Sequence, residues 1–185
     1  LFRRGTEMAA AHGLILVDTK YEAIPFDQFD PDFLVNYVRD KIFPSIEGER
    51  RRLVCQNFID HAGAECKGDY ETLMASCSRK RQDYRRWGKG DDGLMEGIQP
   101  QSYDELCVFY GNLVTFNLFV IHLEIEKFLV AEDTICIEGN VHQMYPGEML
   151  PVAFGIDVDD PDAVYMLTIR MALFFVFDED GLGCG

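Results

Sequence analysis

The sequence predicts an α+β protein in which a curved antiparallel sheet carries three helices on one face. Between residues 47 and 113, apolar residues recur at the three- and four-residue spacing of helices. After residue 119 the apolar pattern takes a period of two over long segments, which is typical of strands. Helices followed by a run of strands indicate an α+β fold. The 185 residues, 48% of them hydrophobic, are enough for one core with an appendage.

We predict an N-terminal appendage and linker over residues 1–44, followed by the main domain over residues 45–185. The appendage has a helix–strand–helix pattern. Its first helix runs from Phe2 to His12, its strand covers Leu14–Val17, and its second helix runs from Asp32 to Ile42. Gly13 ends the first helix, because glycine accepts the left-handed conformation that often follows a helix. Pro44 ends the second.

Three helices are predicted at the start of the main domain. The first carries Val54, Phe58 and Ala62 at helical spacing. The second begins after Gly68. The third begins at Ser102, and Glu105 three residues later completes the pattern of a capping box.

Long strands are predicted for three segments, with a shorter strand between the second and the third. The three long segments are Phe119–Phe128, Thr134–Tyr145 and Val164–Phe177, and the shorter one is Met149–Ile156. A three-residue turn at Ala131–Asp133 would join the first two strands into a hairpin.

The net charge and the cysteine spacing argue against several kinds of partner and binding site. The net charge of −15 argues against nucleic acid and against an anionic membrane. The six cysteines form no Cys-x-x-Cys pair, so we expect no zinc site and a reduced, cytoplasmic protein. The sequence contains no run of eighteen apolar residues, so we predict no membrane span. We predict no cofactor.

The hairpin carries a histidine- and glutamate-rich face. If the apolar residues of both strands face one core, even-numbered residues must pair with even-numbered ones, which sets His122 opposite His142. Imidazoles beside carboxylates form a general acid/base set, so both histidines are candidate catalytic residues. The alternative is the solvated face of a half-buried sheet. A metal held by both histidines and Glu138 is sterically possible, but we predict no metal site.

The strand Val164–Phe177 is apolar on both faces over Leu173–Phe177. An exposed aromatic face is typical of a partner surface, and we predict a homodimer through the sheet. The alternative is a strand buried within a larger monomer. Tyr165 and Arg170 interrupt the apolar pattern. Arg170 either orients an anionic ligand or pairs with surrounding acids.

Local motifs add a resemblance to a known family. The segment Ile59-Asp-His-Ala-Gly-Ala-Glu-Cys-Lys-Gly-Asp-Tyr-Glu-Thr-Leu-Met74 resembles the helix–Gly-Asp–helix opening of the nuclear transport factor 2-like, or SnoaL-like, superfamily. Ile137-Glu-Gly139 and Phe175-Val-Phe-Asp-Glu-Asp-Gly181 are similar to its sheet strands and final turn. The resemblance implies a cone-like sheet. A further strand normally follows that turn, so we expect the last strand to be cut short.

The resemblance also implies an apolar small molecule as ligand. Relatives include acid/base enzymes of isomerase, cyclase and hydrolase type, and non-catalytic modules for binding or dimerisation. Asp83, Tyr84 and Trp87 lie where the family has a short strand near the pocket mouth. His61 is interpreted as structural. The candidate catalytic residues are Asp83, Tyr84, His122 and His142, and the candidate ligand-binding residues are Trp87, Glu138, Tyr165 and Arg170.

The first 22 residues resemble a fragment of another family, the ATP-dependent ligase SAICAR synthetase. The similarity centres on Gly13-Leu-Ile-Leu-Val-Asp-Thr-Lys-Tyr-Glu22. It implies that Lys20 and Glu22 belong to a nucleotide and magnesium site, since a cation suits phosphates and a carboxylate suits Mg²⁺. The family's preceding nucleotide lobe is absent, so the alternative function is a remnant of that ligase.

Overall fold

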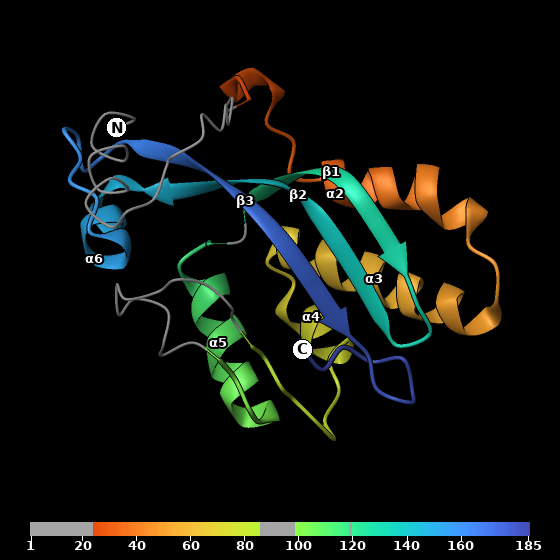
Figure 1. Ribbon diagram of the computed structural model, residues 1–185. Coiled ribbons are helices and arrows are strands. Elements are labelled where there is room, and N and C mark those ends of the chain that lie inside the picture. Colours follow the sequence, from red (N-terminus) through yellow and green to blue (C-terminus); the bar gives the residue numbers. More distant parts are fainter. Residues whose placement is uncertain (1–23, 86–98, 119) are drawn as a thin grey trace, which may run out of the picture.

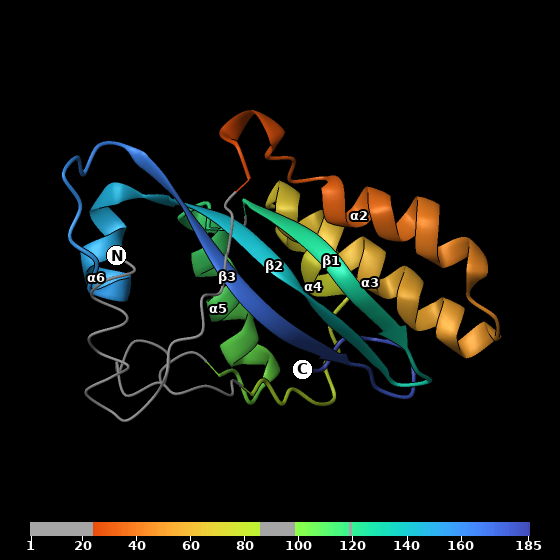
Figure 2. The ribbon, with the colours of Figure 1, turned by 45° about the horizontal axis from the view of Figure 1, so that its top comes forward.

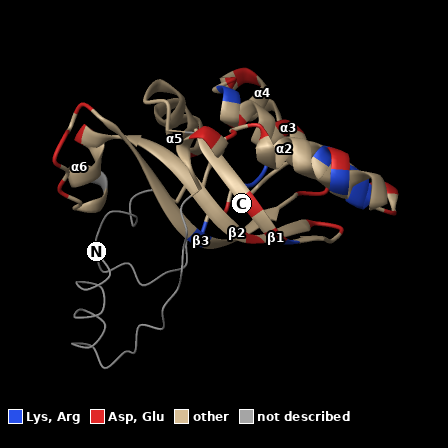
Figure 3. Cartoon of the chain, turned by 90° about the horizontal axis from the view of Figure 1, so that it is seen from above, with Lys and Arg blue, Asp and Glu red and all other residues tan. Residues whose placement is uncertain are grey.

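The computed structural model describes residues 24–85, 99–118 and 120–185. It shows a twisted antiparallel sheet with helices on one side (Figure 1). The view from above in Figure 3 separates the two layers, and it places basic positions mainly on the helical side around α2 and α3. The α+β prediction is confirmed. The helix and strand predicted between residues 2 and 17 lie outside the described residues, as do Lys20 and Glu22.

The predicted helices are present at nearly the predicted positions. The cap residues have the expected geometry. Gly68 ends the longest helix with φ of 65°, and the Ser102 hydroxyl accepts the backbone N–H of Glu105 at 3.2 Å. None of the described helices is long and apolar enough to cross a membrane. The main helices are α2 (Phe33–Tyr37, continued by a π-helix over Val38–Ile42), α3 (Glu49–Lys67), α4 (Tyr70–Ala75) and α5 (Tyr103–Thr115).

The sheet has the order β1-β2-β3 and is antiparallel throughout (Figure 2). The predicted pairing of His122 with His142 is confirmed. The predicted three-residue turn is wrong in its pairing, because Val130 pairs with Ile135 and not with Thr134, and the N–H of Ala131 donates to the carbonyl of Thr134 at 2.8 Å. The strands are β1 (Ile121–Val130), β2 (Thr134–Pro146) and β3 (Val164–Val176).

A β-bulge at Glu126 interrupts the pairing of β1 with β2. Ile125 pairs with Gly139, but Lys127 pairs with Glu138, so Glu126 has no partner in the register. The extra residue shifts the alternation of β1, which lets Phe128 pack against the core. Gly139 is required there, because a Cβ at this position would lie 2.0 Å from the carbonyl oxygen of Glu124.

The strand predicted over Met149–Ile156 is wrong. This segment forms a 3₁₀ turn, Gly147–Met149, and a short helix α6, Leu150–Phe154. Pro151 fits the first turn of a helix, and Gly155 ends it in the left-handed region with φ of 62°. Local capping residues therefore outweigh the apolar character of the segment.

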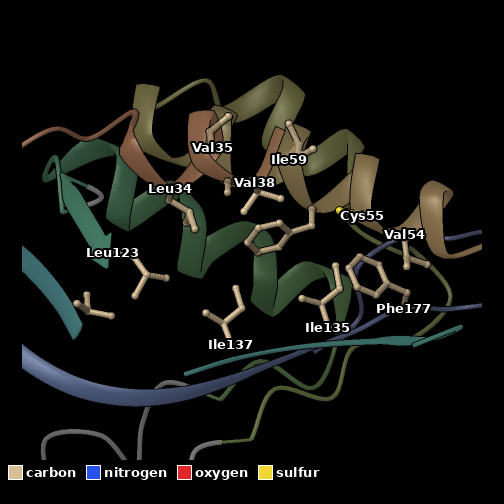
Figure 4. Packing of buried hydrophobic residues seen from close by; sticks show 13 residues of the cluster. Leu34, Val35, Val38, Val54, Cys55, Ile59, Leu123, Ile135, Ile137 and Phe177 are labelled. Atoms are coloured by element: carbon tan, nitrogen blue, oxygen red, sulfur yellow. The ribbon is translucent and has the colours of Figure 1, made fainter. Parts of the chain in front are cut away.

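The main core lies between the sheet and the helices (Figure 4). Helix α3 packs its apolar side against β1 and β2, with Phe58 at the centre and only 1% exposed. Leu34, Val35 and Val38 of the α2 segment belong to the same core. The predicted domain boundary at residue 44 stays a prediction. The α2 segment, which precedes this boundary, packs in the helical layer of the main core. Other core residues are Val54, Cys55, Ile59, Ala62, Leu123, Ile135, Ile137, Val141 and Phe177.

Residues 183–185, the C-terminal tail, hydrogen-bond to the end of β3. The N–H of Cys184 donates to the carbonyl of Val176 at 2.8 Å, and the N–H of Asp83 donates to the carbonyl of Cys184, also at 2.8 Å. This tail therefore lies between the end of β3 and the segment that follows α4. The truncation of the last strand stays a prediction.

Arg50 joins the start of α3 to both turns of the sheet. Its guanidinium donates to the carbonyl oxygens of Glu132 at 2.8 Å, of Glu179 at 3.1 Å, and of Asp178. The first lies in the β1–β2 turn, and the other two lie in the turn after β3. Because five donors in a rigid fork suit several acceptors, this one side chain fixes the helix against the sheet.

We predict that Arg50→Ala lowers the free energy of unfolding by about 2 kcal/mol, since it removes charge-assisted hydrogen bonds to three carbonyls. Urea denaturation measures the change. The control is Arg51→Ala, which removes only an exposed ion pair with Glu132 and should cause a much smaller loss. Equal losses in both variants would contradict the assigned role of Arg50.

Candidate functional site

A polar stripe runs along the inner side of α3. Asn57, His61 and Glu65 are four residues apart, so their side chains leave the helix on the same side. His61 is only 6% exposed. Buried polar groups carry a free-energy cost unless they are hydrogen-bonded, and the partners of His61 therefore define the site.

His61 is hydrogen-bonded through both ring nitrogens. Its Nδ1 lies 2.8 Å from the hydroxyl of Ser76, and its Nε2 lies 3.1 Å from the hydroxyl of Tyr110. The Tyr110 hydroxyl is in turn 2.8 Å from that of Tyr84. Four side chains thus form one buried hydrogen-bonded chain that joins α3, α5 and the segments after α4.

This chain ends at a small cavity between α3, the end of β3 and the C-terminal tail. The cavity has a volume of about 10 Å³, which is room for one water-sized group. Its mouth is open to solvent. Its lining residues are Asn57, Phe58, His61, Tyr84, Phe175, Val176, Phe177, Gly183 and Gly185.

Asn57, which lines this cavity, has a buried acceptor without a hydrogen-bond partner among the described residues. Its amide nitrogen donates to the carbonyl of Ser76 at 3.1 Å, which fixes the orientation of the side chain. Its Oδ1 is buried and has no hydrogen-bond partner among the described residues. A buried carbonyl oxygen without a donor is unfavourable, so Asn57 is suited to accept a hydrogen bond from a bound molecule.

Burial keeps the hydrogen-bonded chain uncharged at neutral pH. It lowers the pKa of His61 to about 4 and raises the pKa values of Tyr84 and Tyr110 above those of ordinary tyrosines. Glu65 differs, because part of the residue reaches the surface while its carboxyl lies among protein atoms that raise its pKa to about 7. Glu65 is therefore the group near the site that titrates around neutral pH.

Known structures share this arrangement of helices and sheet. No family model matches the sequence, and no curated protein matches it. A Shewanella putrefaciens CN-32 protein provisionally named a SnoaL-like polyketide cyclase aligns over 89% of this chain and 88% of its own, with a TM-score of 0.52 and 16% identity. Protein RV0760c from Mycobacterium tuberculosis, in complex with estradiol-17beta-hemisuccinate, aligns over 71% and 88%, with a TM-score of 0.51 and 11% identity.

The chain has the same fold as these two proteins, a SnoaL-like fold. Such low identities establish the fold alone. The fold predicted from the opening helices and the final turn is thereby confirmed.

Tyr84 is the predicted site residue that lines the cavity of this SnoaL-like fold. The neighbouring Asp83 does not line it, because its carboxylate binds the guanidinium of Arg85 at 2.7 and 2.8 Å. That contact lowers the pKa of Asp83. Trp87 lies outside the described residues.

His122 and His142 lie on the face of the sheet that is turned away from α3, and they do not line the cavity. Both share this face with Glu124, since His142 Nε2 lies 3.0 Å from the Glu124 carboxylate. Neither histidine is solvated. His142 is 0% exposed, and His122 accepts the N–H of Asp30 at 3.0 Å beneath the stacked ring of Phe33. Burial lowers the pKa of His122.

The remaining predicted residues are engaged with neighbours on the sheet. Arg170 forms ion pairs with Glu126 and Glu138, and Glu138 also binds Lys127 at 2.5 Å. The alternative that Arg170 pairs with surrounding acids is therefore the one found. Tyr165 donates its hydroxyl to the carbonyl of Asp160 at 3.0 Å. Among the described residues, no group of three or more acidic, histidine or cysteine side chains could hold a metal ion.

Sequence reasoning missed the central residues of the site. His61 was interpreted as structural, and Asn57, Glu65 and Tyr110 were not considered. A signal was present, because a polar residue every fourth position interrupts the apolar side of a predicted helix.

We predict that Glu65→Gln stabilises the protein at pH 7.5 but not at pH 4.5. The pKa of Glu65 is about 7 in the folded protein against 4.5 for an ordinary glutamate, so the folded state disfavours the charged form. The free-energy cost of the charged Glu65 carboxylate in the folded protein is absent below pH 4.5 and grows as the pH rises to 7. The gain at pH 7.5 should be on the order of 2 kcal/mol in the free energy of unfolding. Urea denaturation at both pH values measures it.

The matched control is Glu71→Gln on the exposed side of α4. It should change stability little at either pH. A pH-independent effect of Glu65→Gln would show that the Glu65 carboxyl is not held in an unfavourable environment for its charge.

Proposed function

We propose that this protein binds a small apolar molecule in the cavity between α3 and the end of β3. The observation that supports this most directly is the buried polar chain from His61 through Tyr110 to Tyr84, which ends at a cavity walled by phenylalanines. Ligand sites are usually apolar hollows with a few placed polar groups. Asn57 and Tyr84 would provide those groups here.

The shared fold supports an apolar ring compound as the ligand. RV0760c, with a TM-score of 0.51, was crystallised with a steroid derivative. This cavity, with about 10 Å³, is much smaller than the usual range of about 300–1,000 Å³ for ligand sites. A bound ring would therefore occupy the wider mouth beside Phe175 and place one polar substituent in the enclosed part.

A second candidate function is acid/base catalysis of isomerase, cyclase or hydrolase type on such a molecule. Glu65 lies one helix turn beyond His61 on α3 and outside the lining of the cavity, and its pKa of about 7 suits a general base. Tyr84 would then orient the substrate. Catalytic roles for Asp83, His122 and His142 stay predictions, as do ligand contacts of Trp87, Glu138, Tyr165 and Arg170.

We predict that 2-naphthol, a small ring with one hydroxyl, binds at this cavity and perturbs the NMR signals of residues that line it. Asn57→Leu should weaken binding about 10-fold, because it replaces the unused acceptor with an apolar group. Gln56→Leu is the control, since Gln56 lies on the exposed side of the same helix turn and bonds only Asp60. Signal changes elsewhere on the protein, or equal effects of both substitutions, would contradict this function.

We also propose a homodimer through the outer face of the sheet. Leu129 and Phe174 are 66% and 61% exposed, and both pair with Cys136, so they form one apolar row across all three strands. Next to this row lie the paired charges of Lys127 and Arg170. An apolar centre with a polar rim is typical of protein interfaces.

For the dimer, we expect Phe174→Glu to shift the protein toward monomer in sedimentation velocity, since it places a charge at the centre of the apolar row. Val108→Glu is the matched control on α5, where Val108 is 64% exposed. A wild-type protein that stays monomeric at high micromolar concentration would contradict the proposal.

The remaining expectations are consistent with this function. We propose a cytoplasmic location, which is supported by six free thiols. The net charge of −15 supports the absence of nucleic-acid and membrane partners. The SAICAR synthetase remnant over residues 1–22 stays a prediction outside the described residues.

A further inference from the structure

The hydroxyl of Ser76 sets the direction of the hydrogen bonds in the buried chain. Its oxygen lies 2.5 Å from the carbonyl oxygen of Leu73. A carbonyl can only accept, so the single proton of the Ser76 hydroxyl points to Leu73. The Ser76 oxygen must therefore accept the hydrogen bond from His61.

This requirement determines which nitrogen of His61 carries the proton. Burial keeps the ring neutral, and a neutral imidazole has one N–H and one bare nitrogen. Because Nδ1 faces an oxygen that has no proton left to donate, Nδ1 carries the proton. Nε2 is then the bare nitrogen and accepts the hydroxyl of Tyr110.

The same logic continues to the cavity. The hydroxyl of Tyr110 donates its proton to the hydrogen bond with His61. The oxygen of Tyr110 therefore accepts a hydrogen bond from the hydroxyl of Tyr84. Tyr84, which lines the cavity, is left with oxygen lone pairs and no free proton. Asn57, which also lines the cavity, has a buried acceptor without a partner among the described residues, Oδ1. Both polar groups at the ligand end of the chain are acceptors.

We propose that the site selects a ligand bearing a neutral hydroxyl, which donates its hydrogen bond to Tyr84 or Asn57. This inference rests on the proposed binding function and specifies its ligand as a phenol, enol or alcohol. A ketone or ether oxygen at the same place would face an acceptor. The enclosed volume of about 10 Å³ also suits a single hydroxyl.

The tautomer of His61 tests the inference without any ligand. The ¹⁵N chemical shifts of the imidazole at pH 7 should show a protonated Nδ1 and a bare Nε2. A protonated Nε2 would reverse the whole chain, make Tyr84 a donor toward the cavity, and overturn the inference. This measurement stands even if the probe below does not bind, in which case the proposed function fails instead.

Two matched probes test the selectivity itself. We expect wild-type protein to bind 2-naphthol at least about 10-fold more tightly than 2-methoxynaphthalene, which has the ether oxygen but no proton. In Tyr84→Phe this preference should fall to about 3-fold or less. Tyr103→Phe is the control, because the Tyr103 hydroxyl donates to Met74 away from the cavity, and it should keep the full preference.

Calorimetric titration measures both affinities for each variant. Equal binding of the two probes to wild-type protein would overturn the hydroxyl selectivity while leaving the binding function in place. A preference that persists unchanged in Tyr84→Phe would show that probe size, and not the direction of the hydrogen bonds, causes it.

Discussion

The alternation of side chains along the β1–β2 hairpin is the constraint on which the other elements depend. Ile135 and Ile137 must face α3, and this requirement sends the residues between and beside them to the opposite face. Helix α3 can bury its apolar side only against that inner face. Once α3 is placed, Asn57 and His61 necessarily point toward the end of β3, where the cavity lies. The position of the polar site therefore follows from the packing of the core.

Structural features that follow from a repeating sequence pattern could be predicted from the sequence. The period of two in the strands was enough to set His122 opposite His142, because any other register would expose one apolar set. Short apolar segments carry no such information. Leu150–Phe154 contains four hydrophobic residues, which suit a buried strand as well as a helix turn, and only Pro151 and Gly155 distinguish the two. The bulge is also visible in the sequence, because the alternation of apolar and polar residues in β1 breaks at the adjacent charged residues Glu126 and Lys127.

The site was less predictable, because its members are brought together only by tertiary packing. His61 lies 15 residues from Ser76 and 49 residues from Tyr110 in the sequence. No local pattern joins them, and a lone histidine on a helix is more often structural than functional. Tyr84 was identified through the resemblance to a family and not through its neighbours. The histidine pair on the outer face had the stronger sequence signal, yet His122 holds Asp30 and Phe33 over the start of β1, and His142 is hydrogen-bonded to Thr168 and Glu124.

The bulge at Glu126 has an effect on shape as well as on register. An extra residue in one strand of an antiparallel pair bends that strand and increases its right-handed twist. The end of the hairpin beyond Glu126 is therefore coiled more strongly than a regular ladder would be, and it leans toward the N-terminal half of α3. Gly139 makes this possible, because no side chain stands in the way of the displaced Glu124 carbonyl. One inserted residue and one absent Cβ thus give the sheet its curvature, and a flat hairpin of the same length would leave the first turn of α3 uncovered.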